Sequence, residues 1–352
     1  MKKKLIVSPS GNFYGSEQVL CDYLDHTMNR FDVAVPNGSV FHSKLIGLPH
    51  HIIPFKSTKL LYLKVFFWLL SGKYEKIYIN EAGHSRYVHL LALLFKKAKF
   101  VIHVRILEDT LPGRWTGLRK QNTVLISISD FIQERLEHPS KLIYDLYDFP
   151  DRISGKLRAG SGALNVAIIG RVTYSKGFRE LVELVKELER QQKLSDFTIN
   201  LYGDIIDDVK GDEGMAYLQS KSEIIFRGFV AKEEIYRQSD IVLHLSKTEP
   251  LGRIYFEAIS AGIPLVGYNS GGIGEIGVKT GLQEFLVSPG PDETKALIEK
   301  MEWIKGHGFQ LRPKLMNAME DMKIIYGKKA YTRALDNILI GQDEEEDSYI
   351  SL

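Results

Sequence analysis

Residues 245–276, LSKTEPLGRIYFEAISAGIPLVGYNSGGIGEI, include the residue types best suited to binding a phosphorylated ligand. A strand is expected to end near Ser246 and a helix to begin near Arg253. Free amide groups and the positive end of a helix dipole would then lie at the carboxyl edge of the strand. The amides of Gly252, Arg253 and Ile254 are therefore candidates for contacts with phosphate.

Two carboxylates lie eight residues apart in this segment, Glu249 in the loop and Glu257 about one turn inside the helix. Carboxylates accept strong, charge-assisted hydrogen bonds from hydroxyl groups. The pair could therefore hold two hydroxyl-bearing parts of one ligand whose phosphates lie between them. The alternative, for each glutamate alone, is an ordinary loop residue or a solvated helix residue.

The spacing of these glutamates, followed by AISAGIPLVGYNSGGIGE, resembles the retaining group 1 glycosyltransferases (glycosyltransferase family 4), which have the two-domain GT-B fold. Residues 168–181, IIGRVTYSKGFREL, are similar to that family's strand, Gly-Arg, short loop, Lys-Gly and helix. The resemblance implies that Gly170 lies at the donor and that Arg171 and Lys176 reach its diphosphate. Two fixed cations would stabilise the charge that develops on this leaving group.

Two further donor contacts follow from the resemblance. Glu275 comes after Gly271 and Gly272, which suggest a turn close to the nucleotide or the sugar. Phe229 lies in a stretch similar to the one where the family holds the nucleotide base.

The N-terminal half matches the family more loosely. SGNFYGSEQVL follows the first strand, and Gly15 and Ser16 would approach the donor phosphates through their backbone, although Asn-Phe-Tyr separates the glycines. His103 closes the strand FVIHV, where related enzymes carry a histidine near the reacting sugar; the alternative is a buried strand residue. Its neighbours Arg105 and Glu108 could bind the acceptor.

Glycosyl transfer with retention at the anomeric carbon is the reaction that the resemblance implies. Glu257 would bind the ribose of a UDP- or GDP-type nucleotide sugar, and Glu249 the transferred sugar. No residue is assigned as a nucleophile. The leaving phosphate oxygen would take the acceptor proton, so positioning and charge stabilisation would carry catalysis. Domain closure would expel water that otherwise hydrolyses the donor.

Short apolar runs alternate with amphipathic runs along both halves, which is typical of parallel sheets covered by helices. A segment rich in glycine over 149–163 indicates a linker. The sequence predicts an α/β protein of the GT-B type, with two Rossmann-like, doubly wound domains across a cleft. We expect an acceptor domain over 1–150 with a helix at about 325–341 packed back on it. A donor domain over 151–324 and an acidic, disordered tail at 342–352 complete the prediction.

Charge and composition restrict the partners. The 352 residues are 44% hydrophobic, which is typical of a soluble globular chain. Their formal charge of +2 gives no reason to expect a nucleic acid partner. Residues 1–155 hold 21 Lys and Arg against 14 Asp and Glu, a net of +7, whereas the rest holds 25 against 30, a net of −5. Cys21 is the sole cysteine, and no secretory apolar region follows the basic N-terminus. A cytoplasmic protein is expected, with peripheral association on the inner face of an anionic membrane as a further possibility.

Residues 60–70, LLYLKVFFWLL, are too short to span a bilayer. They predict either a buried helix with one wet stripe or an interfacial helix that presses Phe66, Phe67 and Trp68 against lipid while lysines meet anionic head groups. The lysines around this segment are Lys56, Lys59, Lys64 and Lys73, with Lys96, Lys97 and Lys99 further along the chain.

Several motifs are absent from the sequence. Neither half has GxGxxG after its opening strand, and GxxxxGK[ST], HExxH and paired CxxC are missing, so no metal or other cofactor is expected. From family habits we expect a glycan or lipid-linked acceptor in surface polysaccharide or glycolipid synthesis. A nucleotide-sugar epimerase or a phosphorylase on the same two-domain plan, and an inactive binding protein, are the alternatives.

Overall fold

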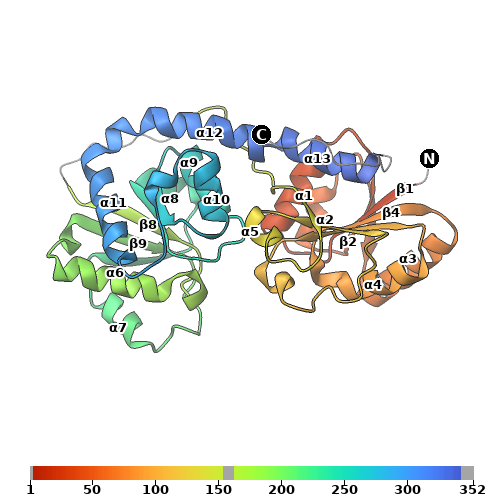
Figure 1. Ribbon diagram of the computed structural model, residues 1–352, viewed down its shortest axis with the longest axis horizontal. Coiled ribbons are helices and arrows are strands. Elements are labelled where there is room, and N and C mark those ends of the chain that lie inside the picture. Colours follow the sequence, from red (N-terminus) through yellow and green to blue (C-terminus); the bar gives the residue numbers. More distant parts are fainter. Residues whose placement is uncertain (1–2, 154–161, 342–352) are drawn as a thin grey trace. The chain divides into compact units, whose positions relative to one another are not determined.

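The structure is a computed structural model that describes residues 3–153 and 162–341. The chain forms two compact units: the first holds Met1–Asp148 and the chain from Tyr326 onward, and the second holds Phe149–Ile325. Each unit is built around one parallel sheet with helices on both faces (Figure 1). The predicted α/β architecture of two Rossmann-like units is therefore confirmed. The predicted acidic tail and most of the predicted linker lie outside the described residues.

Within the described residues, the first unit has a 7-stranded sheet in the order β3-β2-β1-β4-β5-β6-β7. Its elements are β1 (Lys3–Val7), α1 (Gly15–His26), β2 (Asp32–Pro36), α2 (Val40–Leu45), β3 (His51–Phe55), α3 (Thr58–Leu70), β4 (Tyr74–Ile79), α4 (Ser85–Leu94), β5 (Lys99–Val104), β6 (Thr123–Ser127), α5 (Asp130–Gln133), β7 (Ser140–Leu142) and α13 (Lys328–Ile340).

The second unit, as far as the structure describes it, has a 6-stranded sheet in the order β10-β9-β8-β11-β12-β13. Its elements are β8 (Leu164–Ile169), α6 (Phe178–Arg190), β9 (Phe197–Tyr202), α7 (Glu213–Gln219), β10 (Ile224–Gly228), α8 (Lys232–Gln238), β11 (Ile241–His244), α9 (Arg253–Ser260), β12 (Leu265–Tyr268), α10 (Gly271–Lys279), β13 (Leu286–Val287), α11 (Glu293–His307) and α12 (Arg312–Tyr326).

Helix α6 illustrates how the sequence produces these elements. Its apolar residues Phe178, Leu181, Val182 and Val185 follow the i, i+3, i+4, i+7 spacing and are buried, while Glu183 and Arg190 on the other side are exposed. The sheet supplies the apolar surface that this stripe covers, so burial fixes the orientation of the helix.

Strand order reverses once in each sheet. Strand β1 pairs with both β2 and β4, and β8 pairs with both β9 and β11. In open α/β sheets, the loops that leave neighbouring strands at such a reversal part in opposite directions and leave a crevice at the carboxyl edge. The residues after β8 and β11, and those after β1 and β4, therefore occupy the positions where such folds bind ligands.

Helix α13 belongs to the core of the first unit although it comes at the far end of the described chain. Tyr331, Leu335 and Leu339 are buried in the cluster that also contains residues of α1. The Tyr23 hydroxyl donates a hydrogen bond to Asp336 Oδ1 at 2.6 Å. The described residues include no helix that combines the length and the hydropathy of a membrane span.

Candidate functional site

The turn after β8 and the loop after β11 touch because one position between them is glycine. Gly177 has φ of +89°, a left-handed conformation, and a Cβ added there would lie 2.3 Å from the carbonyl oxygen of Leu245. A larger residue would force the two segments apart. This contact brings Lys176 beside Glu249, and Lys176 Nζ donates to Glu249 Oε2 at 2.5 Å.

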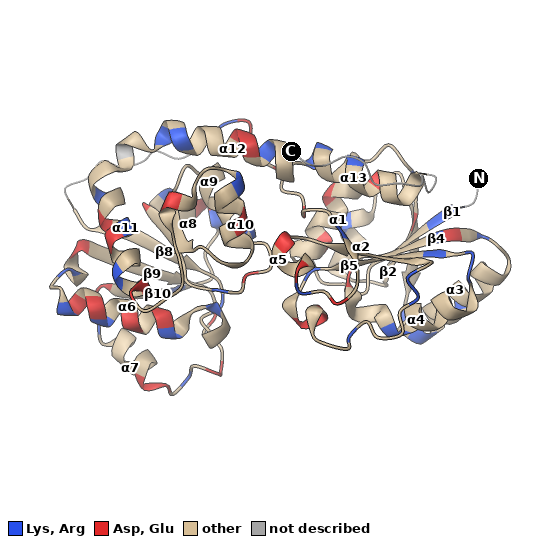
Figure 2. Ribbon diagram, in the orientation of Figure 1, with Lys and Arg blue, Asp and Glu red and all other residues tan. Residues whose placement is uncertain are grey.

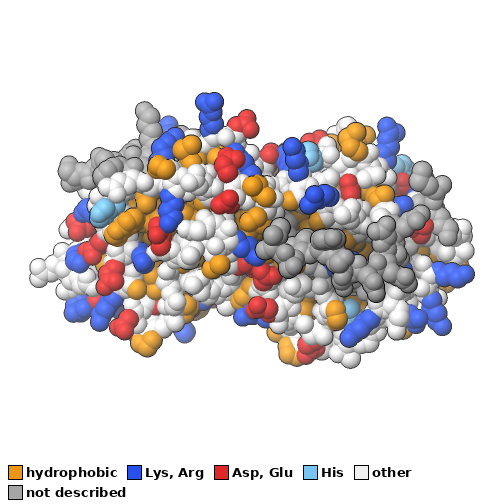
Figure 3. Space-filling model, turned by 45° about the horizontal axis from the view of Figure 1, so that its top comes forward, with side chains coloured by type: hydrophobic (Ala, Val, Ile, Leu, Met, Phe, Trp, Pro, Cys, Tyr) orange, Lys and Arg blue, Asp and Glu red, His pale blue; other side chains and the backbone are white. Residues whose placement is uncertain are grey.

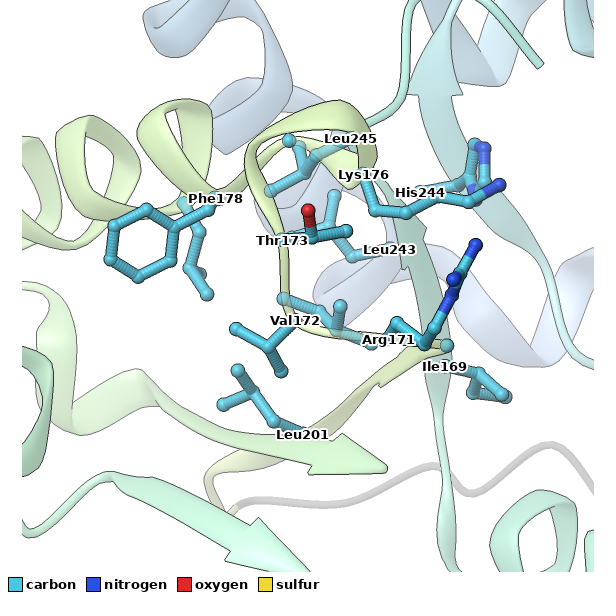
Figure 4. Close-up of a pocket in the computed structure, with 14 residues that line it drawn as sticks. Ile169, Arg171, Val172, Thr173, Lys176, Phe178, Leu201, Leu243, His244 and Leu245 are labelled. Atoms are coloured by element: carbon cyan, nitrogen blue, oxygen red, sulfur yellow. The ribbon is translucent and has the colours of Figure 1, made fainter. Parts of the chain in front are cut away.

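Arg171, Lys176 and His244 present their nitrogen atoms on the same side of the β8–α6 turn (Figure 4). With Gly170 they line a cavity of about 20 Å³, roughly the space of one water molecule. Arg171 is exposed and the Lys176 side chain is 34% exposed. A larger anionic ligand would therefore lie over these cations, on the open side of the turn.

His244 was not predicted from the sequence. Its Nε2 lies 3.6 Å from Glu249 Oε2, and its side chain is 8% exposed. Burial lowers its pKa to about 4 and Lys176 acts in the same direction, while Glu249 opposes them. The ring is therefore neutral at pH 7. The available signal was its place as the last residue of the strand IVLH, directly before the loop that carries Glu249.

Helix α9 begins where the sequence predicted. Gly252 is its N-cap with φ of +90°, and a Cβ there would lie 2.3 Å from Ile273 Cδ1 of α10. A glycine cap has no side chain to bond the amides of the first turn, where Arg253 and Ile254 lie half-buried. The predicted start of the helix is confirmed, and its terminus stays a candidate for binding an anion.

Glu257 faces α8. Its Oε2 accepts a hydrogen bond from the Tyr236 hydroxyl at 2.9 Å, and its Oε1 pairs with Lys232 Nζ. Phe229 is 82% exposed and lies in the loop between β10 and α8. Glu249 thus contacts the β8–α6 turn and Glu257 contacts α8, so the two carboxylates have different neighbours.

Gly271 and Gly272 do not form the expected turn but begin α10. The amide of Gly272 donates to the carbonyl of Glu249 at 2.8 Å, and a Cβ on Gly271 would lie 2.7 Å from the same oxygen. These glycines hold the backbone of Glu249 in place. Glu275 is half-buried in the second turn of α10.

In the first unit, Gly15 and Ser16 begin α1, and the Ser16 hydroxyl donates to Glu81. Glu17 Oε2 accepts from the amide of Tyr14 at 3.0 Å, which caps the helix from its own first turn. Burial raises the pKa of Glu81, the Ser16 bond lowers it, and neighbouring Glu17 raises it further. Glu81 was not predicted; its signal was its position shortly after the strand KIYIN.

His103 and Arg105 are both enclosed within the first unit. The His103 side chain is 0% exposed, with Nδ1 2.7 Å from the Tyr78 hydroxyl, and its ring stacks on Tyr331. The Arg105 guanidinium is 7% exposed and pairs with Asp145. Burial first, and Arg105 second, lower the pKa of His103 well below its usual range.

These contacts tie the two side chains into the core of the first unit, and their contact with a substrate stays a prediction. Glu108 is exposed and remains a candidate for the acceptor. In the part of the chain that the structure describes, no three His, Cys, Asp or Glu side chains gather closely enough to hold a metal ion.

Comparison with known proteins points to one family. Residues 151–319 match the family described as "Glycosyl transferases group 1". An uncharacterised glycosyltransferase of Methanocaldococcus jannaschii is 34% identical over 32% of this chain, and the 2-deoxystreptamine glucosyltransferase of Streptomyces kanamyceticus is 31% identical over 31%. Each match spans 28% of the relative's own length.

The fold is also similar to a crystal structure over nearly the whole chain. HepE of Anabaena in complex with UDP matches with a TM-score of 0.73 at 22% identity, over 96% of this chain and 99% of that one.

Proposed function

Because residues 151–319 are a group 1 glycosyltransferase domain and the chain has the GT-B fold, we propose that this protein transfers a sugar from a UDP-sugar with retention of the anomeric configuration. The carrying observation is the Lys176–Glu249 pair, set beside Arg171 and neutral His244 at the carboxyl edge of the second sheet. The HepE structures with UDP and with UDP-glucose support a uridine donor over a guanosine donor.

The donor would bind to the second unit in three parts. Arg171 and Lys176 would bind the diphosphate, together with the amides at the start of α9. Glu257 would accept hydrogen bonds from the ribose, beside the exposed ring of Phe229. Glu249 would hold the hydroxyls of the transferred sugar. This arrangement fits the different neighbours of the two carboxylates.

Lys176 would change partners when the donor binds. It pairs with Glu249, and its side chain is 34% exposed. Rotation of a partly exposed lysine toward a diphosphate breaks one surface ion pair, which is worth about 1 kcal/mol or less. That rotation would also release Glu249 Oε2 for a sugar hydroxyl. Because burial keeps His244 neutral, its ring carries no positive charge that would pair with Glu249 in place of Lys176.

Chemistry would then rest on charge stabilisation. As the bond between the anomeric carbon and the phosphate oxygen breaks, negative charge grows on the diphosphate beside the two cations. The acceptor hydroxyl would attack from the same face and pass its proton to the leaving phosphate oxygen. No side chain acts as a nucleophile and no metal is proposed, so a chelator should leave the rate unchanged.

The first unit would bind the acceptor. Glu81 and Glu108 are the candidate contacts, because both follow strands at the carboxyl edge of the sheet and carboxylates bind sugar hydroxyls well. We propose a glycan or lipid-linked acceptor, as used in the synthesis of surface polysaccharide or glycolipid, and a cytoplasmic site of action.

Thermal unfolding with UDP, GDP, ADP and their sugars tests the donor. A nucleotide at 100 times its dissociation constant should stabilise the protein by about 2.7 kcal/mol. Stabilisation by UDP and UDP-sugars is expected. Stabilisation by GDP alone would contradict the uridine assignment, and no stabilisation by any nucleotide would contradict the function.

Two alternatives predict other outcomes. An epimerase would convert the UDP-sugar with no acceptor present, whereas a transferase would not. An inactive binding protein would bind UDP without turnover over a wide panel of acceptors. NMR of the product's anomeric proton decides between retention and inversion.

A further inference from the structure

Helix α3 exposes one whole apolar face. Its other face is in the core, where Leu61, Val65 and Leu69 are buried. The exposed residues recur at the i, i+3, i+7, i+10 spacing of a single helical stripe and are each 53–61% exposed; they are Leu60, Leu63, Phe67 and Leu70. A stripe of this kind on a surface helix is unusual, because contact between large apolar side chains and water is unfavourable in free energy.

Helix α4 continues this surface. The rings of Tyr62 and Tyr87 stack at 4.5 Å, and those of Phe66 and Phe95 lie 5.3 Å apart, so the two helices are neighbours. Helix α4 and its last turn expose Leu90, Leu93 and Leu94, each 54–58% accessible. We call the exposed apolar residues of both helices the α3–α4 face.

Positive charge surrounds the α3–α4 face. Neither α3 nor α4 contains Asp or Glu, and their ribbons in Figure 2 carry blue but no red segments. The exposed cations on or beside these helices are Lys56, Lys59, Lys64, Arg86, Lys96 and Lys97. In contrast, both signs of charge are intermixed on the displayed face of the second unit (Figure 3). Six of the 21 basic residues in 1–155 are thus exposed on or beside these two helices, which themselves carry no acidic residue.

We infer that the α3–α4 face docks on a lipid bilayer with anionic head groups. Apolar side chains between basic ones, with no acidic residue among them, match the two attractions that hold an interfacial helix: burial of leucine and phenylalanine below the head groups, and pairing of lysine with anionic lipid. A second copy of this chain fits less well, because its own lysines would face these lysines.

The structure also corrects which aromatic residue meets lipid. Of Phe66, Phe67 and Trp68, Phe67 alone is exposed. Phe66 packs on Phe95, and Trp68 packs edge-on against Tyr74. Phe67 therefore carries the test, together with Leu63 one turn before it.

Vesicle flotation of the full chain tests this inference. The protein should float with vesicles of phosphatidylglycerol and phosphatidylcholine at low salt, and much less with phosphatidylcholine alone. The double variant Leu63→Glu/Phe67→Glu should bind at least about tenfold more weakly. For the double variant Lys59→Glu/Lys64→Glu, the affinity for anionic vesicles should fall roughly fivefold or more for each charge. The matched control is Val278→Glu/Ile324→Glu, two residues 60% and 74% exposed on the second unit, which should bind like the unsubstituted chain.

Three results would overturn the inference: no flotation with anionic vesicles at low salt, equal binding by the Leu63→Glu/Phe67→Glu variant, or an equal loss in the control. Light scattering tests a fourth result that would overturn it. In that case the chain binds no vesicles but forms a dimer, and the Leu63→Glu/Phe67→Glu variant is monomeric. Circular dichroism and UDP binding verify that each variant is folded. Membrane binding and sugar transfer are measured separately, so either can fail alone.

Discussion

Replacing Lys176 by alanine should separate catalysis from stability. Lys176 Nζ lies 2.5 Å from Glu249 Oε2, and the two side chains are 34% and 19% exposed. An ion pair this accessible contributes about 1 kcal/mol or less. The midpoint of thermal unfolding should therefore fall by no more than about 4 °C. Turnover should fall about 100-fold or more, because one preorganised contact to the leaving group is worth roughly 3 kcal/mol in the transition state.

Release of UDP from UDP-glucose and from UDP-N-acetylglucosamine is the assay, first without acceptor and then with a panel of acceptors. The control variant is Lys247→Ala. Lys247 is also 34% exposed and ion-paired, but it faces Glu293 at 2.7 Å and Glu180 at 3.3 Å. It should match Lys176→Ala in stability and the unsubstituted chain in turnover.

Two outcomes would refute this reasoning. Turnover of Lys176→Ala within about threefold of the unsubstituted chain would mean that no charge develops beside this lysine. An equal loss in Lys247→Ala would mean that the loop, and not the cation, had been disturbed.

Three other predictions follow from the geometry. Glu257→Gln should weaken UDP binding about tenfold in calorimetry, since a hydroxyl bonds a charged acceptor more strongly than a neutral one; Glu234→Gln, exposed on the opposite side of α8 from Lys232 and Tyr236, is the control and should change nothing. Arg105→Met should cost about 3–5 kcal/mol in chemical denaturation because it leaves buried Asp145 unpaired, while UDP affinity stays the same; weakened UDP binding in a folded variant would restore a ligand role. Because the pKa of His244 falls from 6.5 to about 4 on folding, the unfolded chain binds a proton that the folded chain does not, and stability is lost as pH falls below about 6.5. The loss should be about 2 kcal/mol at pH 5 and absent in His244→Gln, and identical pH profiles would contradict it.

Some of the site could be predicted because it depends on chain order alone. Residues that directly follow strands β8 and β11 must emerge at the same sheet edge, since parallel strands share their carboxyl ends. Arg171, Lys176 and Glu249 follow these strands, and the resemblance of their motifs to the family singled them out. The left-handed glycines Gly177 and Gly252 support the same geometry, because close approach of two loops needs a residue without a side chain.

Other parts depended on residues far away in sequence. His103 has the position of a ligand-binding histidine, but Tyr331 of α13 covers its ring. Nothing within the strand FVIHV could reveal a neighbour more than 200 residues later. The same holds for His244, whose low pKa results mainly from burial that the assembled second unit creates.

The sequence by itself determined the alternation of strands and helices, the place of cations and carboxylates after strands of the second half, and the net charge of +7 over residues 1–155. Periodicity and spacing are local, so they can be read along the chain. Only the tertiary structure decided which polar side chains are enclosed and which apolar ones are left in water. Helix α3 is apolar nearly all round in sequence, and only packing on one side divides it into a buried face and an exposed one.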